Sequence, residues 1–170
     1  MSNVSPVELS FAQRRLAAAP EFTGELVTAV AAVLRDKGDY VFSVSRATRV
    51  LEAVRLMNVL EIGSVLVVEG RDVVGILSDR DVLNRVVAER RDPETVCVDE
   101  VMTTALPAVG ERTSIAEAMW LMTERRRRHL PVLGDDDRVV GVISIGDLTK
   151  WVIQDKDARI QDLLGYITRP

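Results

Sequence analysis

The sequence predicts an α+β protein built from two copies of one β-α-β-β-α unit. The first observation behind this prediction is that Glu52-Ala53-Val54-Arg55-Leu56-Met57 lies 65 residues before the similar segment Glu117-Ala118-Met119-Trp120-Leu121-Met122. The second is that Val73-Val74-Gly75-Ile76-Leu77-Ser78 matches Val139-Val140-Gly141-Val142-Ile143-Ser144 at an offset of 66. The one additional residue falls in an acidic turn, where insertions are tolerated best. Two similar blocks in the same order indicate an internal duplication.

Hydrophobic periodicity defines the elements inside each copy. Val50, Val54 and Met57 recur at i, i+4 and i+7, as do their equivalents in the second copy, so each copy contains an amphipathic helix. Two short apolar runs follow, over 64–68 and 73–77 in the first copy and over 130–133 and 139–143 in the second. Each pair predicts a hairpin. Helical patterns resume at 79–89 and at 146–154.

Three segments lie outside this repeated pattern. Residues 22–37 predict a leading amphipathic helix that ends at Gly38. The Pro-containing segment 91–94 is the expected linker between the copies, and 157–167 is expected to form a last helix. The predicted organisation is therefore a tail (1–21), a first unit with its leading helix (22–91), a second unit (95–156) and a C-terminal helix or tail (157–170).

Composition excludes several classes of function. The hydrophobic content of 47% is enough for a packed core, and the net charge of −4 gives no general attraction to nucleic acid or to anionic membranes. One cysteine, Cys97, and one histidine, His129, exclude an intramolecular disulfide and leave too few ligands for a zinc or iron–sulfur site. No apolar stretch approaches the length of a membrane span and no secretory signal is evident, so a cytoplasmic protein without a membrane partner is expected.

A Ser-x-x-Asp motif follows the last strand of each copy, as Ser78 and Asp81 in the first and as Ser144 and Asp147 in the second. Such a pair is close to a capping box, which explains either copy by itself. The same helix N-terminus suits a phosphate, and a short carboxylate there can accept hydrogen bonds from ribose hydroxyls. Arg80 adds a positive charge to the first motif, whereas Gly146 adds none to the second.

A basic run, Arg125 to Arg128, leads into the first hairpin strand of the second copy. Arg125 and Arg126 are explained by a solvated helix end that favours positive charge. Arg128 and His129 stand at the start of the strand, where the first copy has Gly63 and Ser64. A phosphate could contact Arg128, with His129 as a hydrogen-bonding partner and not as a metal ligand.

The doubled pattern, with Gly75-Ile76-Leu77-Ser78-Asp79-Arg80-Asp81, Arg128-His129-Leu130-Pro131-Val132 and Gly141-Val142-Ile143-Ser144-Ile145-Gly146-Asp147, strongly resembles a CBS-domain pair, or Bateman module. The resemblance covers residues 22–156 and is to small stand-alone bacterial members. It implies two pseudo-twofold-related units packed sheet to sheet, with two clefts that bind AMP, ADP, ATP, NAD(H) or related adenosyl compounds. It also implies a homodimer.

The resemblance assigns residues to the two clefts by position. One cleft would comprise Lys37, Gly38, Tyr40, Ile62, Gly63, Ser64, Ser144, Gly146 and Asp147. The other would comprise Ser78, Arg80, Asp81, Met102, Thr103, Thr104, Arg128 and His129. Because the basic residues are shared unevenly, we expect unequal affinities, and one site could be empty or take a different ligand.

The expected function is a regulatory module that senses an adenine nucleotide and signals to an unidentified partner protein. An enzyme is not expected, because no nucleophile–base pair and no pair of carboxylates with an evident function is present, and no catalytic cofactor is implied. Two alternatives stay open: a sensor of S-adenosylmethionine, and a nucleic-acid-binding protein that uses Arg125–Arg128, although the acidic balance argues against the latter.

Overall fold

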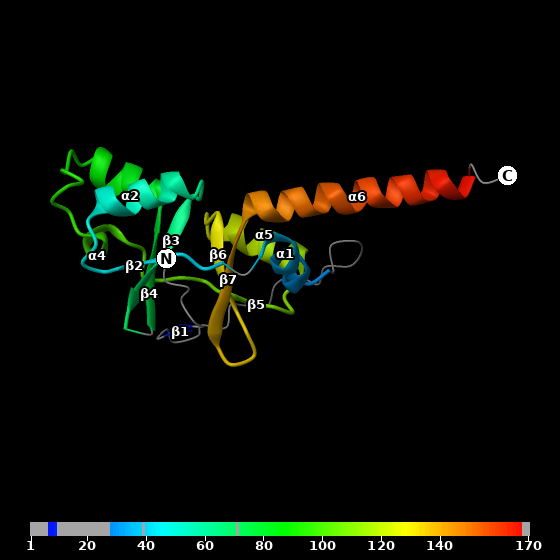
Figure 1. Ribbon diagram of the computed structural model, residues 1–170, viewed down its shortest axis with the longest axis horizontal. Helices are drawn as coiled ribbons and strands as arrows, with labels where there is room; N and C mark the ends of the chain where they lie inside the picture. Colours follow the sequence, from blue (N-terminus) through cyan, green and yellow to red (C-terminus); the bar gives the residue numbers. More distant parts are fainter. Residues whose placement is uncertain (1–6, 10–27, 39, 71, 168–170) are drawn as a thin grey trace.

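The computed structural model describes residues 7–9, 28–38, 40–70 and 72–167 and places the two units side by side (Figure 1). The first unit comprises β2 (Ser43–Ser45), α2 (Val50–Val59), β3 (Ser64–Glu69), β4 (Asp72–Ser78), α3 (Asp79–Val82) and the π-helical segment η2 (Leu83–Val87). The second comprises β5 (Val109–Gly110), α5 (Ile115–Glu124), β6 (His129–Leu133), β7 (Arg138–Ser144) and α6 (Ile145–Ile167). The predicted β-α-β-β-α order is confirmed in both copies.

The two copies share their strand pairing as well as their order. In each, a short parallel strand joins an antiparallel hairpin: β2 pairs with β3 and β3 with β4, and likewise β5 pairs with β6 and β6 with β7. A register shift recurs at the same place, between Val67 and Val68 in the first hairpin and between Val132 and Leu133 in the second. The first pairs of the two hairpins, Ser64 with Ser78 and His129 with Ser144, set each strand start beside the end of its partner.

The two units exchange the segments that precede them. Helix α1 (Val30–Lys37) precedes the first unit in the chain, but Val30, Val33 and Leu34 are buried in the core of the second. Helix α4 (Val98–Val101) precedes the second unit, but Val98 and Val101 are buried in the core of the first. The predicted leading helix over 22–37 is therefore present from residue 30, and it packs on the unit to which it does not belong by sequence. Residues 22–27 lie outside the described residues.

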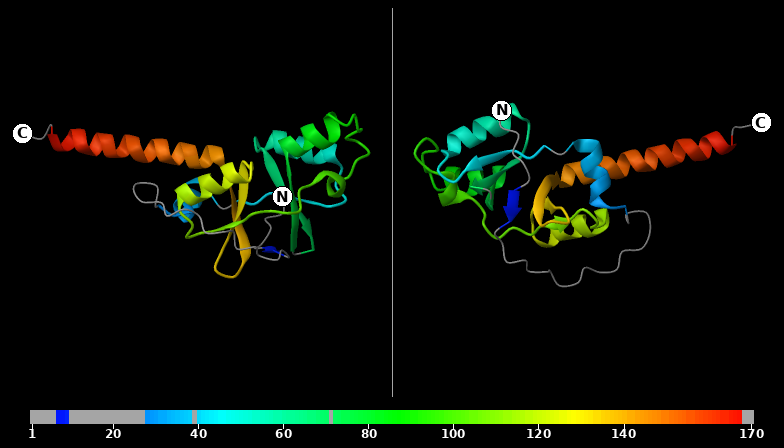
Figure 2. Two further views of the ribbon diagram at one scale, coloured as in Figure 1. Left: turned by 180° about the vertical axis from the view of Figure 1, so that it is seen from behind. Right: turned by 60° about the horizontal axis from the view of Figure 1, so that its bottom comes forward.

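A third core joins the units. Leu66, Val73 and Ile76 of the first unit are buried together with Val139 of the second. Strand β1 (Val7–Leu9), which the sequence did not predict, pairs with β4 and with β7, so the sheet order is β2-β3-β4-β1-β7-β6-β5. The views of Figure 2 show β1 between the two hairpins. The shared core brings the starts of β3 and β6 close together.

One predicted boundary is wrong. The sequence indicated a helix to about residue 154 and a separate one from 157, whereas α6 is continuous over Ile145–Ile167. The intervening Asp155-Lys156-Asp157 is charged but contains neither proline nor glycine, so nothing in it breaks the backbone hydrogen-bond ladder. Both figures show α6 extending well past the rest of the second unit (Figures 1 and 2).

Candidate functional site: two unequal clefts between the units

The larger cleft, here called the Asp147 cleft, has a volume of about 280 Å³. It is bounded by the end of α1, the starts of β3 and β6, and the junction of β7 with α6. All residues that the sequence predicts for this cleft, except Gly146, contribute to its lining. The full lining is Lys37, Gly38, Tyr40, Phe42, Glu61, Ile62, Gly63, Ser64, His129, Val142, Ser144 and Asp147.

Asp147 is held in place on one side of its carboxylate only. Its Oδ2 accepts hydrogen bonds from Lys37 Nζ at 2.7 Å and from the Ser144 N–H at 2.7 Å, while its own N–H donates to Ser144 Oγ at 3.1 Å. Burial raises the pKa of Asp147, but the hydrogen bonds from Lys37 and Ser144 outweigh burial and hold the pKa below its ordinary value. Oδ1 accepts no hydrogen bond from the described residues, and Asp147 is among the residues that line the cleft.

Two aromatic side chains stand at the mouth of the Asp147 cleft. Tyr40 is 73% exposed and stacks on Phe42, with ring centroids 6.4 Å apart and planes inclined by 14°. Gly38 ends α1 with a φ of 88°, a conformation that favours glycine, and a Cβ there would lie 3.3 Å from the Tyr40 ring. The turn therefore sets an exposed aromatic face beside a cleft that holds a free carboxylate oxygen.

His129 forms a wall of this cleft, and it does so because Gly63 has no side chain. A Cβ at Gly63 would lie 3.0 Å from His129 Cε1 and 3.1 Å from Nε2. Burial is the main cause that lowers the pKa of His129. The Asp79 carboxylate opposes this effect, and the positive charges of Arg128 and Lys37 add to it, so that the pKa stays below its ordinary value. The imidazole is consequently neutral at pH 7, and it has one nitrogen that can accept and one that can donate a hydrogen bond.

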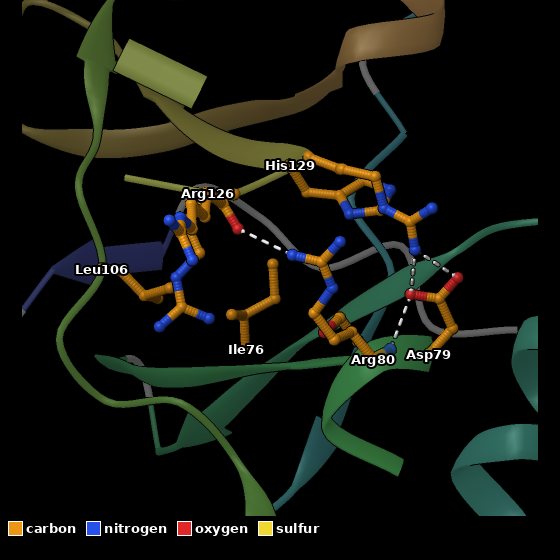
Figure 3. Close-up of a pocket in the computed structure, with 9 residues that line it drawn as sticks. Ile76, Asp79, Arg80, Leu106, Arg126 and His129 are labelled. Atoms are coloured by element: carbon orange, nitrogen blue, oxygen red, sulfur yellow. Dashed lines mark hydrogen bonds and ion pairs between the residues drawn. The ribbon is translucent and has the colours of Figure 1, made fainter. Parts of the chain in front are cut away.

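The smaller cleft, here called the arginine cleft, holds only about 20 Å³ of free volume. It is lined by Ile76, Ser78, Asp79, Arg80, Leu106, Arg126, Arg127, Arg128 and His129. Figure 3 shows the Arg80 guanidinium directed toward the carbonyl oxygen of Arg126, to which it donates at 3.1 Å. Arg128 Nη2 donates to both oxygens of Asp79, at 2.7 and 2.8 Å. Ser78, Arg80, Arg128 and His129 are thus brought together as the sequence suggested.

Four residues assigned to this second cleft do not line it. Asp81 is 5% exposed and its carboxylate is fully engaged: Oδ2 accepts from Ser78 Oγ at 2.5 Å and from the Ser78 N–H at 3.0 Å, and Oδ1 accepts from Thr103 Oγ1 at 2.9 Å. Arg85 Nη1 lies 3.4 Å from Oδ1 as well. Met102 and Thr103 are buried, and Thr104 is exposed outside the cleft. In this copy the Ser-x-x-Asp motif forms a capping box that has no spare acceptor.

Several lining residues were not singled out from the sequence. Phe42 could have been found, because it stands two positions after Tyr40 in an extended segment and so shares its face. Glu61 and Val142 in one cleft, and Asp79, Ile76 and Leu106 in the other, carry no motif of their own. Their positions depend on how the two units meet.

The fold therefore places this protein in the class of tandem α+β proteins whose two units meet near the ends of their strands. Comparison with known proteins identifies the family to which the chain belongs. Residues 30–88 and 98–154 each match the CBS domain. The chain is 37% identical over 108 residues to the CBS domain-containing protein YhcV of Bacillus subtilis (strain 168), covering 64% of this chain and 76% of YhcV. It is 33% identical over 123 residues to the mitochondrial CBS domain-containing protein CBSX3 of Arabidopsis thaliana, covering 69% of this chain and 59% of that protein.

Solved structures agree with this match. A protein with CBS domains from Burkholderia ambifaria MC40-6 superimposes with a TM-score of 0.72 at 43% identity, over 75% of this chain and 96% of that one. The chain therefore belongs to the CBS-domain family and carries a CBS-domain pair. Proteins of this family are generally regulatory and non-catalytic, and CBS domains commonly bind adenine nucleotides. Within the described residues, no helix is both long enough and apolar enough to cross a bilayer.

Proposed function

We propose that this chain is a regulatory module that binds an adenine nucleotide in the Asp147 cleft and signals its presence to a partner protein. The observation that carries the proposal is the combination, in one cavity of about 280 Å³, of a free carboxylate oxygen on Asp147, the Lys37 ammonium and the exposed ring of Tyr40. That volume is near the lower limit of small-molecule sites in general.

Each group suits a different part of a nucleotide. Asp147 Oδ1 can accept a hydrogen bond from a ribose hydroxyl, as acidic residues do in dinucleotide-binding folds. Lys37 Nζ donates to Asp147 and to the Val142 carbonyl at 3.0 Å, which leaves one of its three N–H groups for a phosphate oxygen. The exposed face of Tyr40 offers a stacking surface for the base. Nothing in this set favours bond cleavage over binding.

The position of the cleft supports a signalling role. Its walls come from α1, from the first unit at Glu61 to Ser64, and from the second unit at Ser144 and Asp147. A ligand that contacts all three walls stabilises one relative placement of the units over others, and this differential binding is what shifts a conformational equilibrium. A partner protein that recognises one placement then responds to nucleotide concentration.

The test is calorimetry and thermal unfolding with AMP, ATP, NADH and S-adenosylmethionine. At least one adenine nucleotide should bind and raise the Tm, by mass action on the native state. Asp147→Asn should weaken that binding at least tenfold, because the neutral amide cannot accept as strongly from the ribose. Asp36→Asn is the matched control: it removes the same charge from an exposed position near Lys37 that does not line the cleft. If no member of the panel binds, the proposal is refuted. If S-adenosylmethionine alone binds, the protein is a sensor of that compound and not of an adenine nucleotide.

Self-association is a second part of this proposal. Val59, Leu83 and Val87 of the first unit are 81%, 59% and 61% exposed, and α2 and η2 carry them. We propose that these three side chains form the contact between two copies of the chain in a homodimer, where they become buried. Sedimentation of the wild type and of Leu83→Glu tests it: a dimer that dissociates in the variant supports the contact, and a monomeric wild type refutes it. The cytoplasmic location stays a prediction.

A further inference from the structure

The turn between α5 and β6 concentrates positive charge in a chain that is acidic as a whole. Four consecutive arginines, Arg125–Arg128, occupy this turn, and Arg80 of the first unit lies beside them in the lining of the arginine cleft. The same region holds two carboxylates, those of Glu124 and Asp79. Because the net charge of the chain is −4, the remaining surface is more acidic than this total. We call Arg80 and Arg125–Arg128 the basic surface.

The fold does not require arginines at this turn. In each copy the helix is followed by a residue at positive φ, Glu61 at 53° in the first and Arg126 at 49° in the second. The preceding residue caps the helix, and it is Leu60 in α2 but Arg125 in α5. The next N–H donates back into the helix in both copies, at 3.0 and 2.8 Å. Since the first copy forms the same turn without a basic residue, neither the turn nor the helix end explains the arginines.

The turn holds its arginine side chains ready for a ligand. The side chains of Arg125 and Arg126 are exposed and make no hydrogen bond or ion pair with the residues that the structure describes. Their backbone is fixed by the hydrogen bonds of the turn and by Arg80 Nη1, which donates to the Arg126 carbonyl at 3.1 Å (Figure 3). A ligand therefore meets guanidinium groups on a backbone that is already ordered, which lowers the entropic cost of binding.

The chemistry of the basic surface favours carboxylates on an extended partner. The arginine cleft has room for about one water molecule, so a ligand must lie on the surface and contact the guanidinium groups from outside. A guanidinium can bind both oxygens of a carboxylate, as Arg128 does with Asp79. Nucleic acid fits less well, because no Phe, Tyr or Trp for base stacking is among the residues that line the cleft, and the acidic remainder of the chain repels a long phosphate backbone.

We propose that the basic surface docks an acidic segment of the partner protein, with carboxylates of that segment on Arg125 and Arg126. This inference deepens the function proposed above by naming the chemistry of the partner. Arg128 of the second unit is paired with Asp79 of the first, so a partner carboxylate that takes over Arg128 releases a contact between the units. Docking is thereby coupled to the relative placement of the units, which a ligand in the Asp147 cleft also contacts.

Calorimetry with the peptide hexaglutamate at low ionic strength, in the absence of nucleotide, tests the docking surface. Hexaglutamate should bind and hexaglutamine should not, and added salt should weaken the binding. Arg125→Gln combined with Arg126→Gln should weaken it about fivefold or more, because two charge-assisted hydrogen bonds are lost. The matched control combines Arg55→Gln with Arg90→Gln, which removes the same charge from exposed positions of the first unit and should change the affinity by less than about twofold.

Asp79→Asn tests the exchange of partners at Arg128. It frees the Arg128 guanidinium from its carboxylate, so hexaglutamate should bind about twofold to fivefold more tightly than to the wild type. An unchanged or lower affinity in this variant overturns the coupling through Arg128. Urea unfolding of each variant shows whether the native state is retained.

Two other results overturn the docking surface itself. One is the absence of hexaglutamate binding, or equal weakening by the two double variants. The other is a single-stranded hexauridylate that binds more tightly than hexaglutamate through the same arginines, which would assign the surface to nucleic acid. These outcomes are independent of the nucleotide panel: if every nucleotide fails while hexaglutamate binds, the proposed ligand is refuted and the docking surface stands.

Discussion

Gly141 lies in β7 where α1 crosses the second unit, and its replacement by alanine tests whether a missing side chain sets the position of that helix. A Cβ at this position would lie 2.6 Å from Leu34 Cδ2 and 3.3 Å from Cδ1. Carbon atoms in contact prefer about 3.5 to 4.0 Å, so the Leu34 methyl has to move by about 1 Å. Leu34 is 8% exposed and packed in the core of the second unit, which leaves it little room.

The expected loss of stability follows from two opposing effects. Overpacking of a filled core costs about 1–3 kcal/mol, and the reduced freedom of the unfolded chain on replacing glycine by alanine returns about 0.4–1 kcal/mol. Gly141→Ala should therefore lower the free energy of unfolding by about 1–2 kcal/mol, or the Tm by about 2–8 °C for a chain of this size. Because α1 also carries Lys37 to the Asp147 cleft, nucleotide affinity should fall as well.

Urea unfolding followed by circular dichroism measures the effect, which should appear as a lower midpoint with an unchanged slope. Gly110→Ala is the matched control, since the nearest atom that its Cβ would meet is Thr113 Oγ1 at 3.9 Å. In a Leu34→Ala background the clash is absent, so adding Gly141→Ala should cost nothing. The reasoning is refuted if Gly141→Ala matches Gly110→Ala, or if its cost persists when Leu34 is already alanine.

Three further outcomes are expected. Gly75→Ala should destabilise more than Gly141→Ala in urea unfolding, because its Cβ would lie 3.0 Å from the Thr103 carbonyl oxygen, which is backbone and cannot rotate away; an equal or smaller loss contradicts this. Asp81→Ala should cost about 2–4 kcal/mol in the same assay, because it leaves Ser78 and Thr103 without their shared acceptor, and a loss under about 1 kcal/mol would argue against the network. Because the pKa of His129 is lowered in the folded protein, the unfolded chain binds a proton first as pH falls. The contribution of neutral His129 to the free energy of unfolding is therefore fully present above about pH 6.5 and declines below it. Thermal unfolding between about pH 7.5 and 5 should show a smaller decline of the Tm in His129→Gln than in the wild type.

Much of the fold could be predicted because its signals are local or repeated. The helical spacing of Val50, Val54 and Met57, the two hairpins and the offset between copies are all properties of neighbouring residues, and duplication gives each of them an independent check. Strand β1 escaped prediction because three residues carry no periodicity. The continuity of α6 escaped it because a charged segment looks the same within a solvated helix as in a loop.

The sequence by itself determined the two-unit architecture and the residue types at the strand ends, including the contrast between Gly63 and Arg128. Only the tertiary structure decided which of the two motif aspartates keeps a free oxygen. Asp81 is enclosed because Thr103 comes to its Oδ1 from a segment 22 residues away, whereas Asp147 meets Lys37 on one side alone. The structure also decided that His129 belongs to both clefts, since the ring occupies the space that glycine leaves on the other unit. Such outcomes depend on contacts between residues far apart in the chain, which no local pattern encodes.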